Sequence, residues 1–188
     1  LLSMSGHKFY GPKGVGVLYI RQGTKLMPQL HGGGQEKNRR AGTENVAEIV
    51  GLATALEIAC SERTETTARV QRLRDKLREG VLAIPDAIAT GHPSNRLPNN
   101  ASFCFEHVEG ETILLALDLQ GVGASTGSAC TSASSEPSHV LTAMGISAAV
   151  AHGAMRMTLG KENTDEQVDA VLGLLPAIIE KQRALAPA

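Results

Sequence analysis

Aromatic residues are scarce in this sequence. Its 188 residues include three Phe, two Tyr and no Trp, so aromatics make up only 3% of the chain. Proteins that bind single-stranded nucleic acid stack bases on aromatic side chains, and this composition disfavours that class. An excess of one charge is missing too, because 18 Lys and Arg against 19 Asp and Glu give a formal net charge of −1. We therefore expect no general electrostatic attraction to nucleic acid or to an anionic membrane.

Long apolar runs and paired cysteines are also missing. No segment approaches the roughly 20 consecutive apolar residues that a membrane helix needs, and no charged-then-apolar leader opens the chain. The three cysteines Cys60, Cys104 and Cys130 are an odd number without CxxC spacing, which argues against a disulfide framework or a structural zinc site. We expect a soluble protein of a reducing compartment, the cytoplasm, with no metal and no membrane contact.

The sequence does contain an alternation of strand and helix patterns, which predicts an α/β or α+β fold. Two edge strands around Gly6 and Gly14 are expected to form a hairpin. A polar loop over residues 31–45 follows, and loops of this length in compact chains are usually functional or disordered. From Glu44 the pattern becomes helical, with Thr43 as the candidate N-cap.

This helical pattern continues through Val81, either as one long helix or as two helices broken near Cys60. Polarity rises just after Glu62, so we place a domain boundary there, between residues 1–62 and residues 63–188. The apolar positions of the first helical stretch approximate one face, which we expect to be buried: Val46, Ile49, Val50, Ala53, Leu56 and Ile58.

Residues 63–188 are expected to contain further alternating strands and helices. We expect strands at residues 101–105, 121–125 and 155–159, and helices at 111–119, 137–144 and from Thr164 onward. Pro137 suits the first turn of its helix, Thr164 and Gln167 make a capping box, and Pro176 should kink the last helix. Residues 126–136 contain little that could hold them in a core, so we expect a mobile surface loop. The last helix should turn a set of apolar residues inward: Val168, Val171, Leu172, Leu175 and Ile178.

Lys8 is the first candidate for chemistry. It follows an apolar segment and precedes a glycine-rich turn, where the backbone can approach a bound ligand closely. A solvated surface lysine is the alternative reading, since most lysines are exposed. In a buried setting the amine would be free to form a Schiff base with a carbonyl, and the neighbouring Ser5 and His7 can donate hydrogen bonds to an anion.

Cys130 and Arg156 are the other candidates. Free cysteines are usually buried, which suits Cys60 and Cys104, but the small residues around Cys130 would not bury it. An exposed thiol is better read as a nucleophile or redox centre, and the segment lacks the GxxxxGK[ST] pattern of a phosphate loop. Arg156 alternates with apolar residues in a strand pattern. It is either an edge-strand arginine that faces water or a guanidinium fork that holds a carboxylate.

Four segments resemble the motifs of one protein family, in that family's order and approximate spacing. Residues 5–14, which read Ser-Gly-His-Lys-Phe-Tyr-Gly-Pro-Lys-Gly, resemble the pyridoxal-phosphate lysine motif of the cysteine desulfurases. Residues 32–43 resemble the glycine loop of that family. Residues 127–132 resemble the active-site cysteine segment of its group I branch, the NifS- and IscS-like enzymes. Arg156, with a Leu-Gly pair shortly after it, resembles the arginine motif that binds the substrate carboxylate.

The resemblance implies a fold-type I, aminotransferase-like homodimer of the class V aminotransferase family that uses pyridoxal phosphate. Residues 1–62 would be the end of the large cofactor domain, and residues 63–188 most of the small α+β domain. Lys8 would bind the cofactor covalently and then move the Cα proton of the substrate. Ser5 and His7 would bind the cofactor phosphate, and Thr43 would reach the phosphate from the partner subunit.

By the same resemblance, the Cys130 thiolate would attack the sulfur of L-cysteine, leaving a persulfide on Cys130 and releasing L-alanine, while Arg156 holds the substrate carboxylate. The sulfur would pass to an acceptor or iron–sulfur scaffold protein, for iron–sulfur cluster assembly or tRNA thiolation. Family members are longer, so the chain is expected to need an N-terminal half, on the same or a separate chain, for activity. A selenocysteine lyase, another lyase of the same fold, and a non-catalytic scaffold or sulfur-acceptor module remain alternatives.

Overall fold

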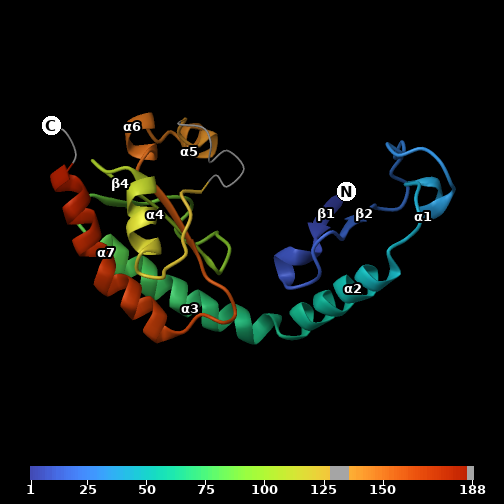
Figure 1. The fold of residues 1–188 in the computed structure, drawn as a ribbon, viewed down its shortest axis with the longest axis horizontal. Coiled ribbons are helices and arrows are strands. Elements are labelled where there is room, and N and C mark those ends of the chain that lie inside the picture. The colour runs from blue at the N-terminus through green and yellow to red at the C-terminus, as the bar shows by residue number, and fades with distance from the viewer. Residues whose placement is uncertain (128–135, 186–188) are drawn as a thin grey trace. The chain divides into compact units, whose positions relative to one another are not determined.

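The computed structural model describes residues 1–127 and 136–185 of the chain. Its contacts divide the chain into two compact units, Leu1–Thr64 and Glu65–Ala188, which Figure 1 colours from blue to teal and from green to red. Strands and helices alternate along the chain, which confirms the expected α/β class. Within the described residues, no helix is both long and apolar enough to cross a membrane.

The first unit combines a two-stranded sheet with a long helix. Strands β1 (Leu2–Ser5) and β2 (Gly16–Tyr19) pair in antiparallel fashion, so the expected hairpin is confirmed. The one-turn 3-10 helix η1 (Gly6–Phe9) lies between them in sequence. The short helix α1 (Gln35–Asn38) and the long helix α2 (Val46–Ser61) follow.

The cap of helix α2 is Asn45 and not the expected Thr43. The Asn45 side chain accepts a hydrogen bond from the backbone N–H of Glu48 at 3.4 Å, which satisfies one of the free donors of the first turn. Thr43 lies too early in the chain for this role, because it follows Gly42, whose φ of +106° keeps the backbone in a turn.

The apolar positions of α2 are mostly exposed, contrary to the expectation from the sequence. Leu52 is buried, whereas Val46 and Val50 are 65% and 57% exposed. Burial requires a facing surface, and the main neighbour of α2 within this unit is the single turn η1. Cys60 is exposed as well, so its expected burial is wrong. Of the two alternatives for this stretch, two helices with a break near Cys60 is the correct one, because α2 ends one residue later and a new helix, α3 (Arg63–Leu82), follows.

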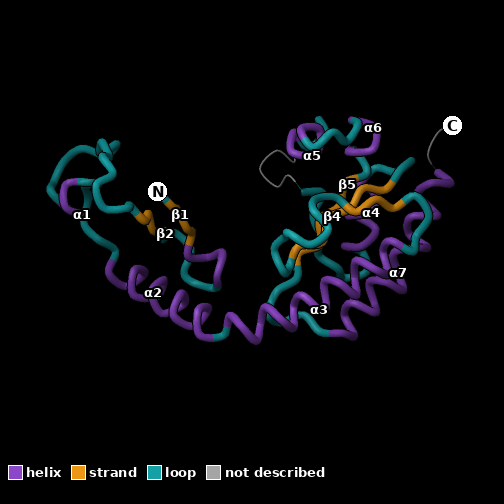
Figure 2. The backbone as a smooth tube through the Cα atoms, turned by 180° about the vertical axis from the view of Figure 1, so that it is seen from behind, coloured by secondary structure: helices purple, strands orange, loops and turns teal. Residues whose placement is uncertain are grey.

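The second unit is a three-stranded antiparallel sheet packed against helices (Figure 2). Its strands, in the spatial order β3-β4-β5, are β3 (Ala87–Ala89), β4 (Asn100–Phe105) and β5 (Ala154–Thr158). Besides α3 it contains the helices α4 (Gly110–Asp118), α5 (His139–Ala143), α6 (Ala148–Ala151) and α7 (Asp165–Leu185). The strands expected near 101–105 and 155–159 and the helix expected near 111–119 are confirmed.

The core of this unit lies between the sheet and the helices α3, α4 and α7. Phe103 of β4 and Met155 of β5 are fully buried, and so are Leu73 of α3, Ile113 of α4 and Leu175 of α7. Each such side chain contributes about 1.5–3 kcal/mol by leaving water. The inward set expected for α7 is confirmed, because its members are buried in this cluster or packed against it.

The strand expected over residues 121–125 is absent. Only Ser125 pairs with the sheet, through an isolated antiparallel bridge to Arg156. Gly121 adopts a φ of +77°, which turns the chain directly after α4 and shortens the extended stretch. Most of the expected loop over 126–136 lies outside the described residues.

The last two helices expected from the sequence begin differently with respect to prediction: one starts later than expected, and the other has the predicted cap. The helix expected from Pro137 begins instead at His139, because the residue between them keeps a non-helical backbone as the N-cap. The capping box before α7 is confirmed: the Gln167 N–H donates to Thr164 Oγ1, and the Thr164 N–H donates to Gln167 Oε1, both at 3.3 Å. The helix α7 continues on both sides of Pro176.

Candidate functional site

The Lys8 turn joins the end of a strand to a single helical turn. Strand β1 ends at Ser5, and η1 then carries His7 and Lys8. A hydroxyl, an imidazole and an amine therefore come from four consecutive residues, and all three side chains belong to exposed residues. The structure thus brings these three predicted site residues together on one turn.

Close backbone packing holds this turn in place. The Gly6 N–H donates to the Val15 carbonyl oxygen, and the Gly11 N–H donates to the Gly6 carbonyl oxygen, each at 2.9 Å. Gly6 is buried, and a Cβ atom added to it would lie 3.0 Å from the Pro12 carbonyl oxygen. Tyr10 closes the turn with a φ of +68°. The conformation that presents Lys8 is therefore set by backbone contacts on both sides.

The following residues rest on small side chains of α2. A Cβ atom on Gly51 would lie 2.7 Å from Pro12 Cγ, and one on Gly11 would lie 3.3 Å from Ala55 Cβ. Larger side chains at these α2 positions would push the turn away from the helix. Gly51 and Ala55 are thus supporting residues that the sequence reasoning missed. The available signal was a pair of small residues four apart on one helix face.

Thr43 lies in the same unit, in the chain between the glycine loop and α2. The Gly42 N–H donates to Gln35 Oε1 at 3.1 Å and closes this loop. Three consecutive residues in it, Glu36 to Asn38, adopt positive φ angles of 48°, 55° and 63°. Thr43 itself is exposed, and none of the hydrogen bonds described in residues 1–64 joins it to the Lys8 turn.

Arg156 lies in β5 of the second unit and is half-buried. Ser102 of β4 is opposite it on one side, and the bridge to Ser125 lies on the other. Its Nη1 donates to the Gly127 carbonyl oxygen at 2.7 Å. In the part of the chain that the structure describes, no carboxylate lies within ion-pairing distance of Arg156. Among the described residues, the guanidinium is therefore held at Nη1 by the Gly127 carbonyl, and its further N–H groups can donate to a ligand.

The two described cysteines, Cys60 and Cys104, differ sharply in burial. Cys104 is fully buried in β4, as expected, and burial raises the pKa of its thiol from 9.0 to about 11. It is therefore unsuited to supply a thiolate near neutral pH. Cys60 is exposed at the end of α2. The predicted nucleophile, Cys130, lies outside the described residues.

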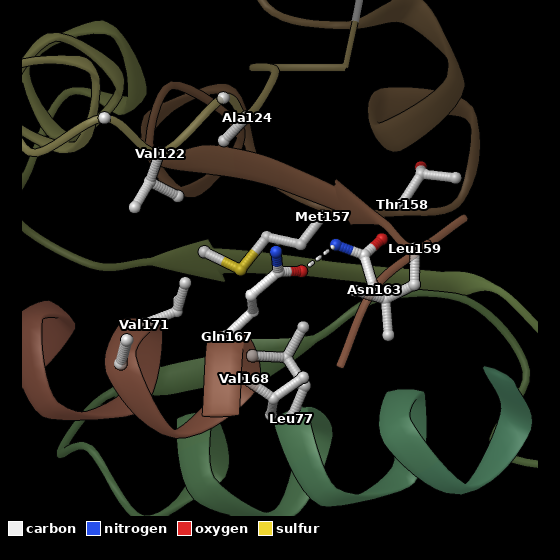
Figure 3. A pocket seen from close by; sticks show the side chains of 13 residues that line it. Leu77, Val122, Ala124, Met157, Thr158, Leu159, Asn163, Gln167, Val168 and Val171 are labelled. Atoms are coloured by element: carbon white, nitrogen blue, oxygen red, sulfur yellow. Dashed lines mark hydrogen bonds between the residues drawn. The ribbon is translucent and has the colours of Figure 1, made fainter. Parts of the chain in front are cut away.

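A pocket of about 290 Å³ lies between α7, β5 and the stretch that precedes Ser125 (Figure 3). Met157, Val168 and Val171 give it an apolar wall, and Asn163 Nδ2 donates to Gln167 Oε1 at 2.9 Å beside it. None of the predicted site residues lines this pocket. Elsewhere among the described residues, no group of three His, Cys, Asp or Glu side chains could hold a metal ion.

The donors of the Lys8 turn match the functional groups of pyridoxal phosphate. Hydroxyl and imidazole groups suit a phosphate, and a primary amine suits the aldehyde carbon. Because a Cβ on Gly6 would crowd the Pro12 carbonyl, the close fold of the turn depends on glycine there. The residues present in the first unit therefore fit this cofactor.

The fold and this lysine turn define a class of protein. Residues 1–171 match the model of the aminotransferase class-V family, so the chain belongs to that family, whose members depend on pyridoxal phosphate. A cysteine desulfurase IscS from Methanosarcina thermophila is 54% identical over 187 residues, which are 100% of this chain and 46% of the relative. The cysteine desulfurase NifS from Azotobacter vinelandii is 51% identical, over 100% of this chain and 47% of its own. The chain spans about half the length of the curated relatives that it matches.

Solved structures agree with this placement. A NifS-like protein superposes with a TM-score of 0.85 and 40% identity, over 95% of this chain and 46% of its own. The cysteine desulfurase CsdA from Escherichia coli has a TM-score of 0.72 over 96% of this chain and 46% of its own; at 21% identity this likeness concerns the fold alone. The expected fold class and family are thereby confirmed.

Proposed function

We propose that this chain forms the part of a cysteine desulfurase that removes sulfur from L-cysteine and yields L-alanine and a Cys130 persulfide. The observation that carries the proposal is the identity of 50–55% to IscS and NifS desulfurases over the whole chain. The Lys8 turn supports it, because its donors match the cofactor of the family. Residues 1–62 then belong to the large cofactor domain and residues 63–188 to the small domain.

Each candidate residue has a role that its chemistry allows. Pyridoxal phosphate supplies an electron sink for the bond-breaking at the substrate Cα. The Ser5 hydroxyl and the His7 imidazole bind its phosphate, together with Thr43 of the second subunit of a homodimer. Lys8 Nζ holds the cofactor and then moves the Cα proton. Arg156 binds the substrate carboxylate through its planar fork of N–H donors.

Sulfur transfer requires a thiolate from Cys130. The thiolate attacks the sulfur atom of L-cysteine, so that the new S–S bond forms as the substrate C–S bond breaks, and the carbon skeleton leaves as L-alanine after protonation. The structure of SspA in complex with cysteine matches with a TM-score of 0.59 and 34% identity, over 86% of this chain and 44% of its own, which supports L-cysteine as substrate. The persulfide sulfur then passes to an acceptor, such as an iron–sulfur scaffold protein, in the cytoplasm.

The exposed apolar surface of the first unit supports the need for further polypeptide. Leu2, Leu18 and Tyr19 of its sheet are 57%, 46% and 57% exposed, and Val46 and Val50 of α2 are exposed as well. Apolar surface of this kind marks an interaction site. In the proposed enzyme, an N-terminal half and the second subunit cover it.

The fate of the cysteine sulfur tests the proposal. The protein is incubated with pyridoxal phosphate and L-cysteine, with an N-terminal half added if the chain alone gives no absorbance band of lysine-bound cofactor. We expect L-alanine, and one additional sulfur atom on Cys130 by peptide mass spectrometry. Lys8→Ala should abolish the absorbance band. Cys130→Ala should abolish alanine formation and keep the band, and Cys60→Ala is the matched control that keeps both.

Two outcomes would contradict this proposal. Alanine formation that survives Cys130→Ala excludes the persulfide route and favours a selenocysteine lyase or another lyase of the same fold. The absence of a cofactor band under every condition favours a non-catalytic scaffold or sulfur-acceptor module.

A further inference from the structure

Three residues form a closed hydrogen-bonded network on the open edge of the second sheet. Strand β5 is the last strand in the order β3-β4-β5, and Ser125 bridges to it from outside. The Arg156 N–H donates to the Ser125 carbonyl oxygen at 2.6 Å, and the Ser125 N–H donates to the Arg156 carbonyl oxygen at 3.2 Å. The Arg156 side chain then turns back along the bridging segment and donates through Nη1 to the Gly127 carbonyl oxygen.

The Ser125 side chain completes this network. Its Oγ accepts a hydrogen bond from the Gly127 N–H at 3.1 Å, the pattern by which serine stabilises a tight turn two residues on. Gly127 adopts a φ of +106°, a conformation that glycine reaches without steric cost. The Ser125 hydroxyl and this backbone angle therefore stabilise the turn that carries the Gly127 carbonyl.

The orientation of that carbonyl matters for the guanidinium. A carboxylate is best held by two parallel N–H groups on one edge of the guanidinium plane. The Gly127 carbonyl binds at Nη1 and leaves donors on Nε and Nη2. A guanidinium that is already held in one plane loses less rotational freedom when a carboxylate binds, and this raises affinity. No acidic side chain among the described residues competes for it.

We propose that Ser125 is a positioning residue, which orients the Arg156 guanidinium for the substrate carboxylate through the Gly127 carbonyl. This inference rests on the proposed function, in which Arg156 binds that carboxylate. A purely structural role for Ser125 makes a different prediction, because it would lower the amount of folded protein and leave the affinity of the folded protein for L-cysteine unchanged.

Ser125→Ala removes the acceptor for the Gly127 N–H and loosens the turn that carries the Gly127 carbonyl. The loss of one neutral hydrogen bond in this chain of contacts should raise KM for L-cysteine roughly threefold to tenfold, with a smaller effect on kcat. Ser125→Thr keeps a hydroxyl oxygen and should restore KM. Ser138→Ala is the matched control, since Ser138 caps α5 without a side-chain hydrogen bond.

The experiment measures KM and kcat for the three variants in the assembled enzyme with pyridoxal phosphate. In parallel, the Arg156 side-chain NMR signal of the 188-residue chain is titrated with L-alanine in the absence of cofactor. A higher KM and a weaker L-alanine titration in Ser125→Ala, both restored in Ser125→Thr, support the inference. Unchanged KM and titration, or equal effects in Ser138→Ala, overturn it.

The titration separates failure of this inference from failure of the proposed function. If the wild-type enzyme forms no L-alanine from L-cysteine, the proposed function fails. The L-alanine titration then still decides the role of Ser125: a threefold to tenfold weaker midpoint in Ser125→Ala than in the wild type shows that Ser125 positions Arg156 for carboxylates. Equal midpoints show that it does not.

Discussion

The two units contain similar apolar patterns and differ in what they bury. Fifteen residues form the main core cluster of the second unit, including Phe103 and Leu175. In the first unit, which is described throughout, only Gly6 and Leu52 are buried. The difference shows that a hydrophobic pattern specifies a surface to be covered, and that burial follows only where a second surface is present.

The same difference applies to the candidate site residues of the two units. Lys8 lies on a turn held by backbone hydrogen bonds and by small residues of α2, in a unit with little core of its own. Arg156 lies in a strand whose neighbours Met155 and Met157 are buried. The second unit therefore has the packing to hold its site residue by itself, whereas the first depends more on its partners in the proposed enzyme.

The largest expected effect is the loss of a core side chain in the second unit. Phe103→Ala leaves a cavity beneath the sheet and should lower the free energy of unfolding by about 3–5 kcal/mol. Leu18→Ala is the matched change in the first unit, where the Leu18 side chain is 46% exposed. This variant should change the free energy of unfolding by less than about 0.5 kcal/mol. Urea denaturation followed by circular dichroism measures both. Equal losses in the two variants would break the comparison.

Cysteine reactivity gives the next largest contrast. Cys104 has a pKa of about 11 because of burial, so near pH 8 its thiolate fraction is about 100-fold below that of an ordinary thiol. Cys60 is exposed and should react rapidly with iodoacetamide. Peptide mass spectrometry distinguishes the two sites and counts Cys130 separately. In urea both should react at similar rates.

The same pKa shift predicts a loss of stability in alkaline solution. In the unfolded chain the Cys104 thiol ionises near its ordinary value of 9.0, whereas in the folded chain it stays protonated until about 11. The unfolded state therefore releases a proton first, and rising pH between these values favours unfolding. Cys104→Ala should remove this part of the pH dependence. Rapid alkylation of Cys104 in the folded protein at pH 8 would contradict the burial on which both cysteine predictions depend.

Features set by neighbouring residues could be predicted from the sequence. The capping box of Thr164 and Gln167 involves residues three apart, and the alternation in 101–105 shows a strand directly. The motif around Lys8 could be predicted for the same reason, because Ser5, His7 and Lys8 lie within four consecutive residues of the sequence. Such features depend on local geometry, which a short sequence window contains.

Features that depend on distant partners could not be predicted in this way. The hydrogen bond from Arg156 to Gly127 joins residues 29 positions apart, and no periodic pattern in the sequence predicts it. The exposure of Val46 and Val50 depends on which surfaces face α2. The single bridge at Ser125, in place of a strand, depends on where the chain turns after α4. These outcomes are set by tertiary contacts, which override local preference.

The smallest expected effect concerns an ion pair between α3 and α7 in the second unit. Arg72 donates through both Nη atoms to the Asp165 carboxylate at 2.7 and 2.6 Å, and these hydrogen bonds lower the pKa of Asp165 from 3.8 to about 2. The pKa of Asp165 is lower in the folded chain than in the unfolded chain. The pair therefore stabilises the fold at pH values above 3.8, and this contribution is lost as the pH falls toward 2. The effect on stability is small because the two side chains are 59% and 40% exposed, so solvent screens them. Arg72→Gln should move the Asp165 midpoint in an NMR titration back toward 3.8, and an unchanged midpoint would show that Arg72 does not control it.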